Sequence, residues 1–287
     1  MELKNITKVY SNKKILDNIN FSFNQKNIIG LIGKNGVGKT TLMKIITGNI
    51  TNFQGTRISD EKIGYSIENP KLYNKKSGYE NIKIFSYILS STFDKAYINS
   101  LIDEFDMKQY INKKVKKYSM GMKQKLSIVI ALINSPSILI LDEPTNGMDP
   151  DGSIKVLKKI KQLAYKKNIK VLISSHKLED IELICEKAIF LKDGTFIKEL
   201  DLTSKNKYTS TVITTFNSDF QLALHTLKKK FEIKKVDELS SSIIISYQAI
   251  HSDVISELAK KNIFPKSIFN QKNTLRNTYF DINEGEK

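Results

Sequence analysis

The stretch IIGLIGKNGVGKTTLMKII, residues 28–46, decides the fold of this chain. It runs from a short apolar segment, residues 28–32, through the octapeptide GKNGVGKT, residues 33–40, into a segment expected to be helical. The octapeptide fits the pattern G-x-x-x-x-G-K-[ST], in which glycines let the backbone wrap around an anion and the following helix presents its positive end. We therefore predict a strand, a phosphate-binding loop and a helix, in that order.

The positions of this loop have predicted tasks. Lys39 should reach the β and γ phosphates, the Thr40 hydroxyl should bind Mg²⁺, and Thr41 should contact the α phosphate. A glycine-rich turn that binds nothing is the alternative, and the flanking strand and helix argue against it. The residues predicted to hold the nucleotide in this loop are Gly33, Lys34, Asn35, Gly36, Val37, Gly38, Lys39, Thr40 and Thr41.

Two further apolar runs deliver polar side chains at their ends. SILILDEPT, residues 137–145, presents Asp142, which is suited to hold Mg²⁺ through water, and Glu143, which is suited to orient or deprotonate an attacking water. VLISSH, residues 171–176, ends at His176, a hydrogen-bond partner for a γ phosphate. Adjacent acids and a lone histidine are weak signals alone, but the carboxyl ends of parallel strands meet at one edge of a sheet.

The wider pattern indicates an α/β fold. The continuous apolar runs at 28–32, 138–141 and 171–173 suit strands that are buried on both faces of a parallel sheet. Helix-spaced apolar positions lie between them, and residues from about 70 to 115 look like an inserted helical arm. Near the start of the chain, alternating apolar positions predict an antiparallel β subdomain. The positions used are Leu3, Ile6, Val9, Ile19, Phe21 and Phe23 for strands, and Leu126, Val129, Ile130, Ile133, Leu157, Ile160 and Leu163 for helices.

The pattern changes after Gly194. Strands are expected over residues 211–216, 231–236 and 242–247, around helices near Leu222 and Val254. We therefore predict a main domain over residues 1–204 and a small C-terminal α+β accessory domain over residues 205–287.

A second anion site is suggested by YSMGM, residues 118–122. Ser119 is placed to cap the helix that follows, and Gly121 would let a phosphate approach the helix end closely. A well-capped helix with no ligand explains the same residues, and from these residues alone it is the better explanation.

Taken in order, these motifs resemble the nucleotide-binding subunit of an ABC transporter, over about residues 1–200. GKNGVGKT resembles the Walker A loop, ILILD with Glu143 resembles Walker B, and YSMGMKQKL resembles the signature that contains Ser119 and Gly121. NGMDP, residues 146–150, resembles the D-loop with Asp149, and His176 matches the switch histidine. Tyr10 stands where the family places an aromatic ring that stacks on adenine.

Two departures from the family pattern qualify the resemblance. Most members carry glutamine where IGYSIENPKLY has Glu68. In this replacement the chain resembles bacitracin and lantibiotic export and immunity proteins. The resemblance implies that Glu68 touches Mg²⁺ and the membrane subunit, and a carboxylate is an adequate ligand. In the signature, three positions differ from the usual leucine, glycine and glutamine, while Ser119 and Gly121 remain. The three replacements are Tyr118, Met120 and Met122.

The resemblance implies a P-loop ABC ATPase that hydrolyses ATP with Mg²⁺ in a head-to-tail dimer. The dimer would be a homodimer or a heterodimer with a second ATP-binding subunit, and each ATP would lie between one Walker A loop and the opposite signature. It would power export of antimicrobial or amphipathic peptides through a separate multi-span permease, contacted near Glu68, Pro70 and Tyr73. A soluble ABC ATPase and a regulatory nucleotide switch without a transport role are the alternatives.

Composition limits the other possibilities. The chain has 287 residues, 40% hydrophobic and 26% charged, which is typical of a globular protein. Its net charge of +16 rests on lysine, because Arg57 and Arg276 are the only arginines, so we expect a solvated lysine surface and no nucleic-acid partner. Anionic lipid head groups are a secondary possibility. The absence of a leader, the single cysteine Cys185 and the lack of a long apolar stretch predict a protein at the cytoplasmic face of the cell membrane, held there by its permease.

Overall fold

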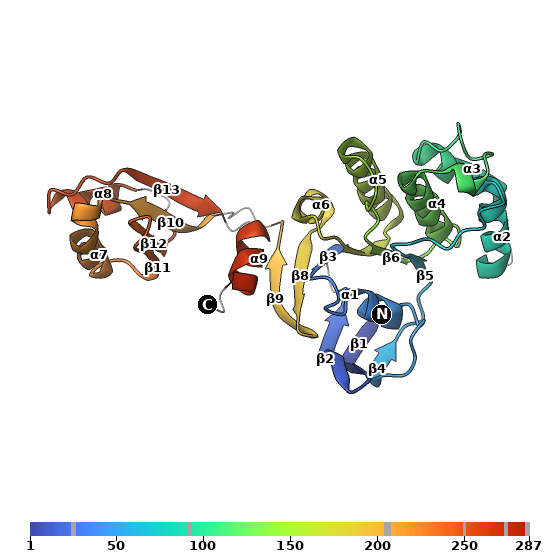
Figure 1. The fold of residues 1–287 in the computed structure, drawn as a ribbon, viewed down its shortest axis with the longest axis horizontal. Helices are drawn as coiled ribbons and strands as arrows, with labels where there is room; N and C mark the ends of the chain where they lie inside the picture. Colours follow the sequence, from blue (N-terminus) through green and yellow to red (C-terminus); the bar gives the residue numbers. More distant parts are fainter. Residues whose placement is uncertain (24–26, 91–92, 204–207, 249–250, 273–274, 285–287) are drawn as a thin grey trace. The chain divides into compact units, whose positions relative to one another are not determined.

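The chain divides into two compact units, residues 1–203 and 204–287. A computed structural model describes residues 1–23, 27–90, 93–203, 208–248, 251–272 and 275–284 (Figure 1). The first unit contains the segment 28–46 and all of the motifs described above, so its layers decide where the candidate site forms.

A six-stranded sheet forms the centre of the first unit, with the strand order β5-β6-β7-β3-β8-β9. All of its pairs are parallel except that of β9, which runs antiparallel at the edge. Every residue of β3 and β6 is buried, which confirms the prediction of strands covered on both faces. The strands are β3 (Ile28–Ile32), β5 (Ile63–Ser66), β6 (Ile138–Asp142), β7 (Lys170–Ser174), β8 (Lys187–Lys192) and β9 (Thr195–Asp201).

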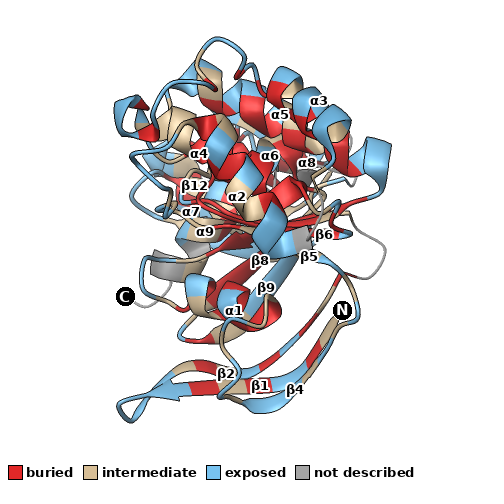
Figure 2. Cartoon of the chain, turned by 90° about the vertical axis from the view of Figure 1, so that its right-hand side faces the viewer, coloured by how far each residue is buried: buried red, intermediate tan, exposed pale blue. Residues whose placement is uncertain are grey.

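A smaller antiparallel sheet packs below, with the order β2-β1-β4. Its strands are β1 (Glu2–Tyr10), β2 (Lys13–Ser22) and β4 (Gln54–Ile58). Helix α1 (Lys39–Ile46) lies between the two sheets (Figure 2), and its buried residues Leu42 and Met43 join one core with Ile6 of β1 and Ile140 of β6. The predicted alternation at Ile19, Phe21 and Phe23 is confirmed, since all three are buried while Asn20 is exposed. In β1, Leu3 and Ile6 are buried as expected, but Val9 is exposed.

Helices cover the other face of the large sheet. They are α2 (Gly78–Ser90), α3 (Lys95–Glu104), α4 (Met120–Leu132), α5 (Pro150–Lys167) and α6 (Leu178–Ile184), with a short 3₁₀ turn η1 (Val115–Lys117). The helical arm is shorter than the predicted range 70–115, because α2 begins at Gly78. A capping box fixes this start: the Glu80 amide donates to the Ser77 hydroxyl at 3.1 Å, and the Ser77 amide donates to the Glu80 carboxylate at 2.7 Å.

The second unit is built from β10 (Tyr208–Thr214), η2 (Asn217–Asp219), α7 (Phe220–Lys228), β11 (Ile233–Asp237), β12 (Ser242–Ser246), α8 (Ser252–Ala259), β13 (Ser267–Lys272) and α9 (Leu275–Glu284). Its antiparallel sheet has the order β11-β12-β10-β13. Ile213, Ile243 and Ile245 from the sheet meet Leu227 and Leu258 from α7 and α8 in a separate core. The sequence predicted three of these strands and two helices, but not β13 or α9.

Among the helices that the structure describes, none combines the length and the apolar character needed to span a membrane. Cys185 is free and buried.

Candidate active site

The phosphate loop joins β3 to α1 and adopts a conformation that only glycine accepts readily. Gly38 has φ +114°, and a Cβ there would lie 2.8 Å from the carbonyl oxygen of Ile15. The Lys39 ammonium lies inside the loop and donates to the carbonyl oxygens of Gly33 at 2.7 Å and Lys34 at 3.2 Å. These bonds show that the lysine already points into the space that the loop encircles.

Lys39 is the buried cation of the site, with 7% of its surface exposed. Burial lowers its pKa below the usual value, because a low-dielectric surrounding disfavours the charged form. The carboxylates of Glu143, Asp142 and Glu68 act in the opposite direction and favour the ammonium. The site therefore places one cation among three anions, where a polyanion with a divalent cation could balance both signs.

The carboxylate of Asp142 is fixed at both oxygens. The Thr40 hydroxyl donates to Oδ2 at 2.7 Å, and the Ser174 hydroxyl donates to Oδ1 at 2.7 Å. The Ser174 oxygen also accepts the backbone N–H of Glu143 at 3.0 Å, so β7 orients the end of β6. Sequence reasoning missed Ser174, although it lies within the quoted segment VLISSH.

The donor set fits Mg²⁺. Thr40, Asp142 and Glu68 offer hydroxyl and carboxylate oxygens to one cavity, and Mg²⁺ in proteins is usually held by one or two carboxylates together with substrate phosphates and water. In the described part of the chain there is no cluster of three or more His, Cys, Asp or Glu side chains that could hold a metal unaided. The side chains therefore suit a cation that arrives with phosphate.

The buried carboxylate of Glu143 pairs with the exposed imidazole of His176. The Nδ1 atom of His176 lies 2.9 Å from Oε2 of Glu143, and the His176 backbone N–H donates to the same oxygen at 3.2 Å. A carboxylate oxygen only accepts, so Nδ1 is the donor in this contact. Glu143 has φ +50°, an uncommon conformation for a side-chain-bearing residue, and 7% of its surface is exposed. The backbone at Glu143 is therefore locally strained while its carboxylate is held against His176.

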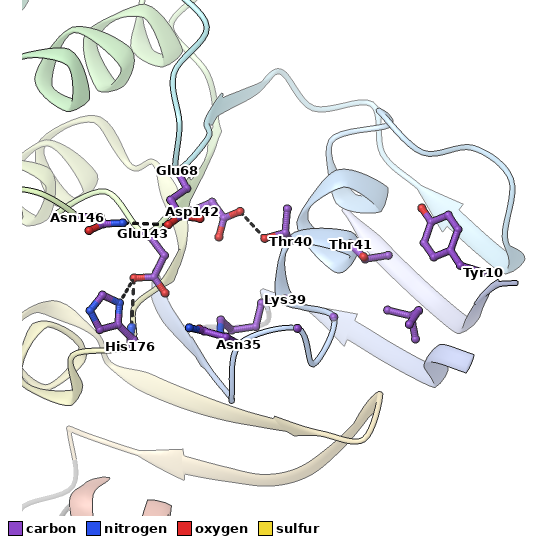
Figure 3. Close-up of a pocket in the computed structure, with 13 residues that line it drawn as sticks. Tyr10, Asn35, Lys39, Thr40, Thr41, Glu68, Asp142, Glu143, Asn146 and His176 are labelled. Atoms are coloured by element: carbon purple, nitrogen blue, oxygen red, sulfur yellow. Dashed lines mark hydrogen bonds and ion pairs between the residues drawn. The ribbon is translucent and has the colours of Figure 1, made fainter. Parts of the chain in front are cut away.

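Asn146 is a site residue that sequence reasoning placed only within the resemblance to the D-loop. Its Nδ2 donates to Oε1 of Glu68 at 2.9 Å, across 78 residues (Figure 3). Nothing local in the sequence signals this bond, because it joins a loop after β6 to the loop after β5.

These side chains line one cavity of about 640 Å³ (Figure 3). Tyr10 lies at the end remote from His176, half-exposed, with the Lys8 ammonium 4.5 Å from its ring centroid. Gly33, Lys34 and Val37 belong to the loop but do not line the cavity. The lining residues are Tyr10, Ile15, Asn35, Gly36, Gly38, Lys39, Thr40, Thr41, Glu68, Asp142, Glu143, Asn146 and His176.

Ser119, Gly121 and Asp149 do not line this cavity. Ser119 caps α4 by accepting the Met122 N–H at 3.2 Å, and Asp149 caps α5 by accepting the Gly152 N–H at 2.7 Å, which lowers the pKa of Asp149. A Cβ at Gly121 would lie 3.1 Å from Met148 Cγ, so the signature and the residue before Asp149 are in contact. Three of the predicted residues therefore form a second locus in the same unit.

The fold and the cavity define a P-loop NTPase. The ABC transporter family matches residues 16–146. The lantibiotic transport ATP-binding protein SrtF of Streptococcus pyogenes is 37% identical over 208 residues, 69% of this chain and 90% of that protein. The bacitracin transport ATP-binding protein BcrA of Bacillus licheniformis is 31% identical over 254 residues, 84% of this chain and 83% of that protein.

A solved structure supports the fold. The dimeric post-hydrolysis state of the ATP-binding cassette MJ0796, bound to ADP and Pi, has a TM-score of 0.62 and 23% identity, and the match covers 71% of this chain and 99% of that one. The two relatives, 37% and 31% identical over more than two thirds of this chain, show that the chain belongs to the ABC transporter ATP-binding family. It is an ATP-binding ATPase subunit of a transporter.

Proposed function

We propose that this chain hydrolyses ATP with Mg²⁺ at a site shared by two ATP-binding subunits, and so powers export through a separate multi-span permease at the cytoplasmic face of the cell membrane. One observation carries the proposal. The cavity gathers a phosphate loop, two fixed carboxylates and a histidine, while Ser119, Gly121 and Asp149 lie at a second locus outside it. Ser119 and Asp149 cap α4 and α5, and a shared site would in addition bring this second locus to the ATP of the other subunit.

Within the cavity, each side chain has a proposed role. Tyr10 stacks on the adenine, while Lys39 and the loop amides hold the β and γ phosphates. Thr40, Asp142 and Glu68 hold Mg²⁺, which neutralises charge on the phosphate oxygens.

Glu143 accepts a proton from the water that attacks the γ phosphate. His176 holds Glu143 through the 2.9 Å contact, and a ring N–H of His176 donates a hydrogen bond to the γ phosphate.

The second locus acts on the ATP of the other subunit. Ser119 offers a hydroxyl and the N-terminus of α4 offers backbone N–H groups, a combination that suits phosphate. Gly121 leaves room for close approach, and Asp149 orders the loop that leads into α5. The dimeric state of MJ0796 supports this arrangement, with a second copy or a second ATP-binding subunit as the partner.

Two likenesses support a peptide cargo. SrtF and BcrA, the relatives compared above, are named for lantibiotic and bacitracin transport, and Glu68 with the YSMGM signature resembles such proteins. We therefore propose antimicrobial or other amphipathic peptides as cargo.

Helix α2 supports contact with a permease. Tyr87, Ile88 and Leu89 expose between 50% and 63% of their surface on this helix of the arm, and Tyr73 in the preceding loop exposes 50%. Exposed apolar side chains gathered on one element are typical of a surface that binds a partner.

Reconstitution with membranes tests the proposal. Affinity-tagged chain should copurify with a multi-span membrane protein, and the complex in vesicles should show ATP-dependent peptide export that Lys39→Ala abolishes and Lys44→Ala preserves. Replacing Ile88 by Asp should disrupt the complex without loss of ATP binding. Hydrolysis without a membrane partner would favour a soluble ATPase, and binding without turnover would favour a regulatory switch.

A further inference from the structure

Glu68 is held at both of its ends by side-chain amides from other parts of the unit. Asn146 Nδ2 donates to its carboxylate oxygen Oε1 at 2.9 Å, and Gln124 Nε2 donates to its backbone carbonyl oxygen. Gln124 is fully buried, and its own Oε1 has no hydrogen-bond partner in the described part of the chain. A buried acceptor without a partner weakens the fold. Among the described residues, the hydrogen bond to Glu68 is the one polar contact found for the Gln124 side chain.

The two amides come from segments that pack on each other. A Cβ at Gly147 would lie 2.6 Å from Cγ of Met120, and a Cβ at Gly121 would lie 3.1 Å from Cγ of Met148. The loop that carries Asn146 therefore rests on the first turn of α4, and Gln124 lies one turn further along the same helix. The loop after β6 and the start of α4, where Ser119 also lies, therefore pack on each other and both hydrogen-bond to Glu68.

The direction of the hydrogen bond at the carboxylate is fixed by chemistry. A carboxylate only accepts, so Glu68 needs a donor opposite, and the amide of Asn146 supplies it. A carboxylate at position 146 would face Glu68 with like charge and no donor. The same carboxylate would pair well with a glutamine at position 68, whose amide donates.

We propose that Asn146 and Gln124 are positioning residues that fix Glu68 at the cavity, and that position 146 carries an amide because position 68 carries a carboxylate. This inference rests on the proposed function for its consequence in catalysis. The hydrogen bonds themselves join residues of this chain alone.

A reciprocal exchange tests the pairing. Asn146→Asp should lower ATP turnover at least tenfold and lower the melting temperature of the nucleotide-free, metal-free protein by about 3–8 °C. Adding Glu68→Gln should restore turnover to within about threefold of the Glu68→Gln single variant and recover most of the lost melting temperature, because the donor and acceptor have changed places. Asn99→Asp, the same change at an exposed amide on α3 outside the cavity, is the control and should leave both values near wild type. Asn146→Asp with wild-type turnover, or a double variant no better than Asn146→Asp, would overturn the proposal.

Gln124→Met tests the second contact with almost constant side-chain volume. It removes the donor to Glu68 together with the unpartnered oxygen, so the melting temperature should change by no more than about 3 °C. The kcat should fall at least fivefold with KM for ATP changed less than twofold, since Glu68 acts at the reacting phosphate end of ATP. The control is Gln162→Met, at an exposed position of α5. An unchanged kcat would overturn the role of Gln124. If the wild type does not hydrolyse ATP at all, the proposed function fails, and the thermal exchange cycle in the nucleotide-free protein still decides whether Asn146 and Glu68 are paired.

Discussion

The hydroxyl of Thr40 lies 2.7 Å from Oδ2 of Asp142, although 102 residues separate the two in the chain. Neighbouring ligands of an octahedral Mg²⁺, each about 2.1 Å from the ion, lie about 3 Å apart. The two oxygens therefore already lie close enough together to serve as ligands of one cation.

Replacing Thr40 by Val should remove the benefit of Mg²⁺ for nucleotide binding. The ATP affinity measured with Mg²⁺ should fall at least tenfold, while the affinity measured in EDTA should change little, because the lost oxygen serves the metal. Titration of a fluorescent ATP analogue under both conditions measures this. Thr56→Val, on exposed β4, is the control. An equal loss in EDTA would show that Thr40 contacts the nucleotide itself.

Glu143→Gln should stop hydrolysis and preserve binding. The amide keeps the shape of the side chain but cannot accept the proton of water, so turnover should fall by a factor of about 10² to 10⁴. ATP should then hold the subunits together as a stable dimer in size-exclusion chromatography. The exposed Glu179→Gln is the matched control, and wild-type turnover in Glu143→Gln would exclude Glu143 as the base.

Two inactive variants should complement each other if the site is shared. Lys39→Ala damages the cavity, and Ser119→Ala damages the second locus, so a homodimer of either has two defective sites. Mixing them at equal amounts should restore about a quarter of wild-type activity, because half of the dimers are mixed and each mixed dimer has one intact site. Activity that stays at the level of the single variants, or a Ser119→Ala protein that pairs and turns over normally, would contradict the shared site.

Asp149 predicts a pH dependence of stability. The Gly152 N–H bonded to its carboxylate holds the pKa below the usual 3.8, so the folded state favours the charged form. The resulting stability is present above the unfolded pKa and is lost as pH falls through the lower folded pKa. The melting temperature of the wild type minus that of Asp149→Asn should therefore be positive at pH 7 and shrink below about pH 4. A difference that is constant between pH 7 and 3 would show that the charge of Asp149 contributes nothing.

Much of the first unit could be predicted because its signals are local. The phosphate loop is a contiguous pattern, and the buried runs of β3 and β6 are unbroken in the sequence. The second unit was harder to predict. The strand β13 has the sequence SIFNQK, whose apolar residues do not alternate, and its partners in β10 lie 53 to 64 residues away in the chain.

The pairings inside the site could not be predicted, because they join residues that share no local pattern. Asn146 meets Glu68, and Ser174 meets Asp142, only through the side-by-side order of β5, β6 and β7. That order is a property of the whole sheet. Roles for Ser119, Gly121 and Asp149 stay predictions, since they depend on a second subunit.

The position of β3 in the sheet has a consequence for synthesis of the chain. The strand that carries the phosphate loop is made early, yet its two neighbours are β7 and β8, which end at Ser174 and Lys192. Until the ribosome has released those residues, β3 has two open edges and no cavity beside it, and such edges attract other chains. ATP can therefore bind and stabilise the first unit only after most of that unit has been synthesised. Truncated chains that end before β8 gain no such stabilisation and are targets for aggregation or proteolysis.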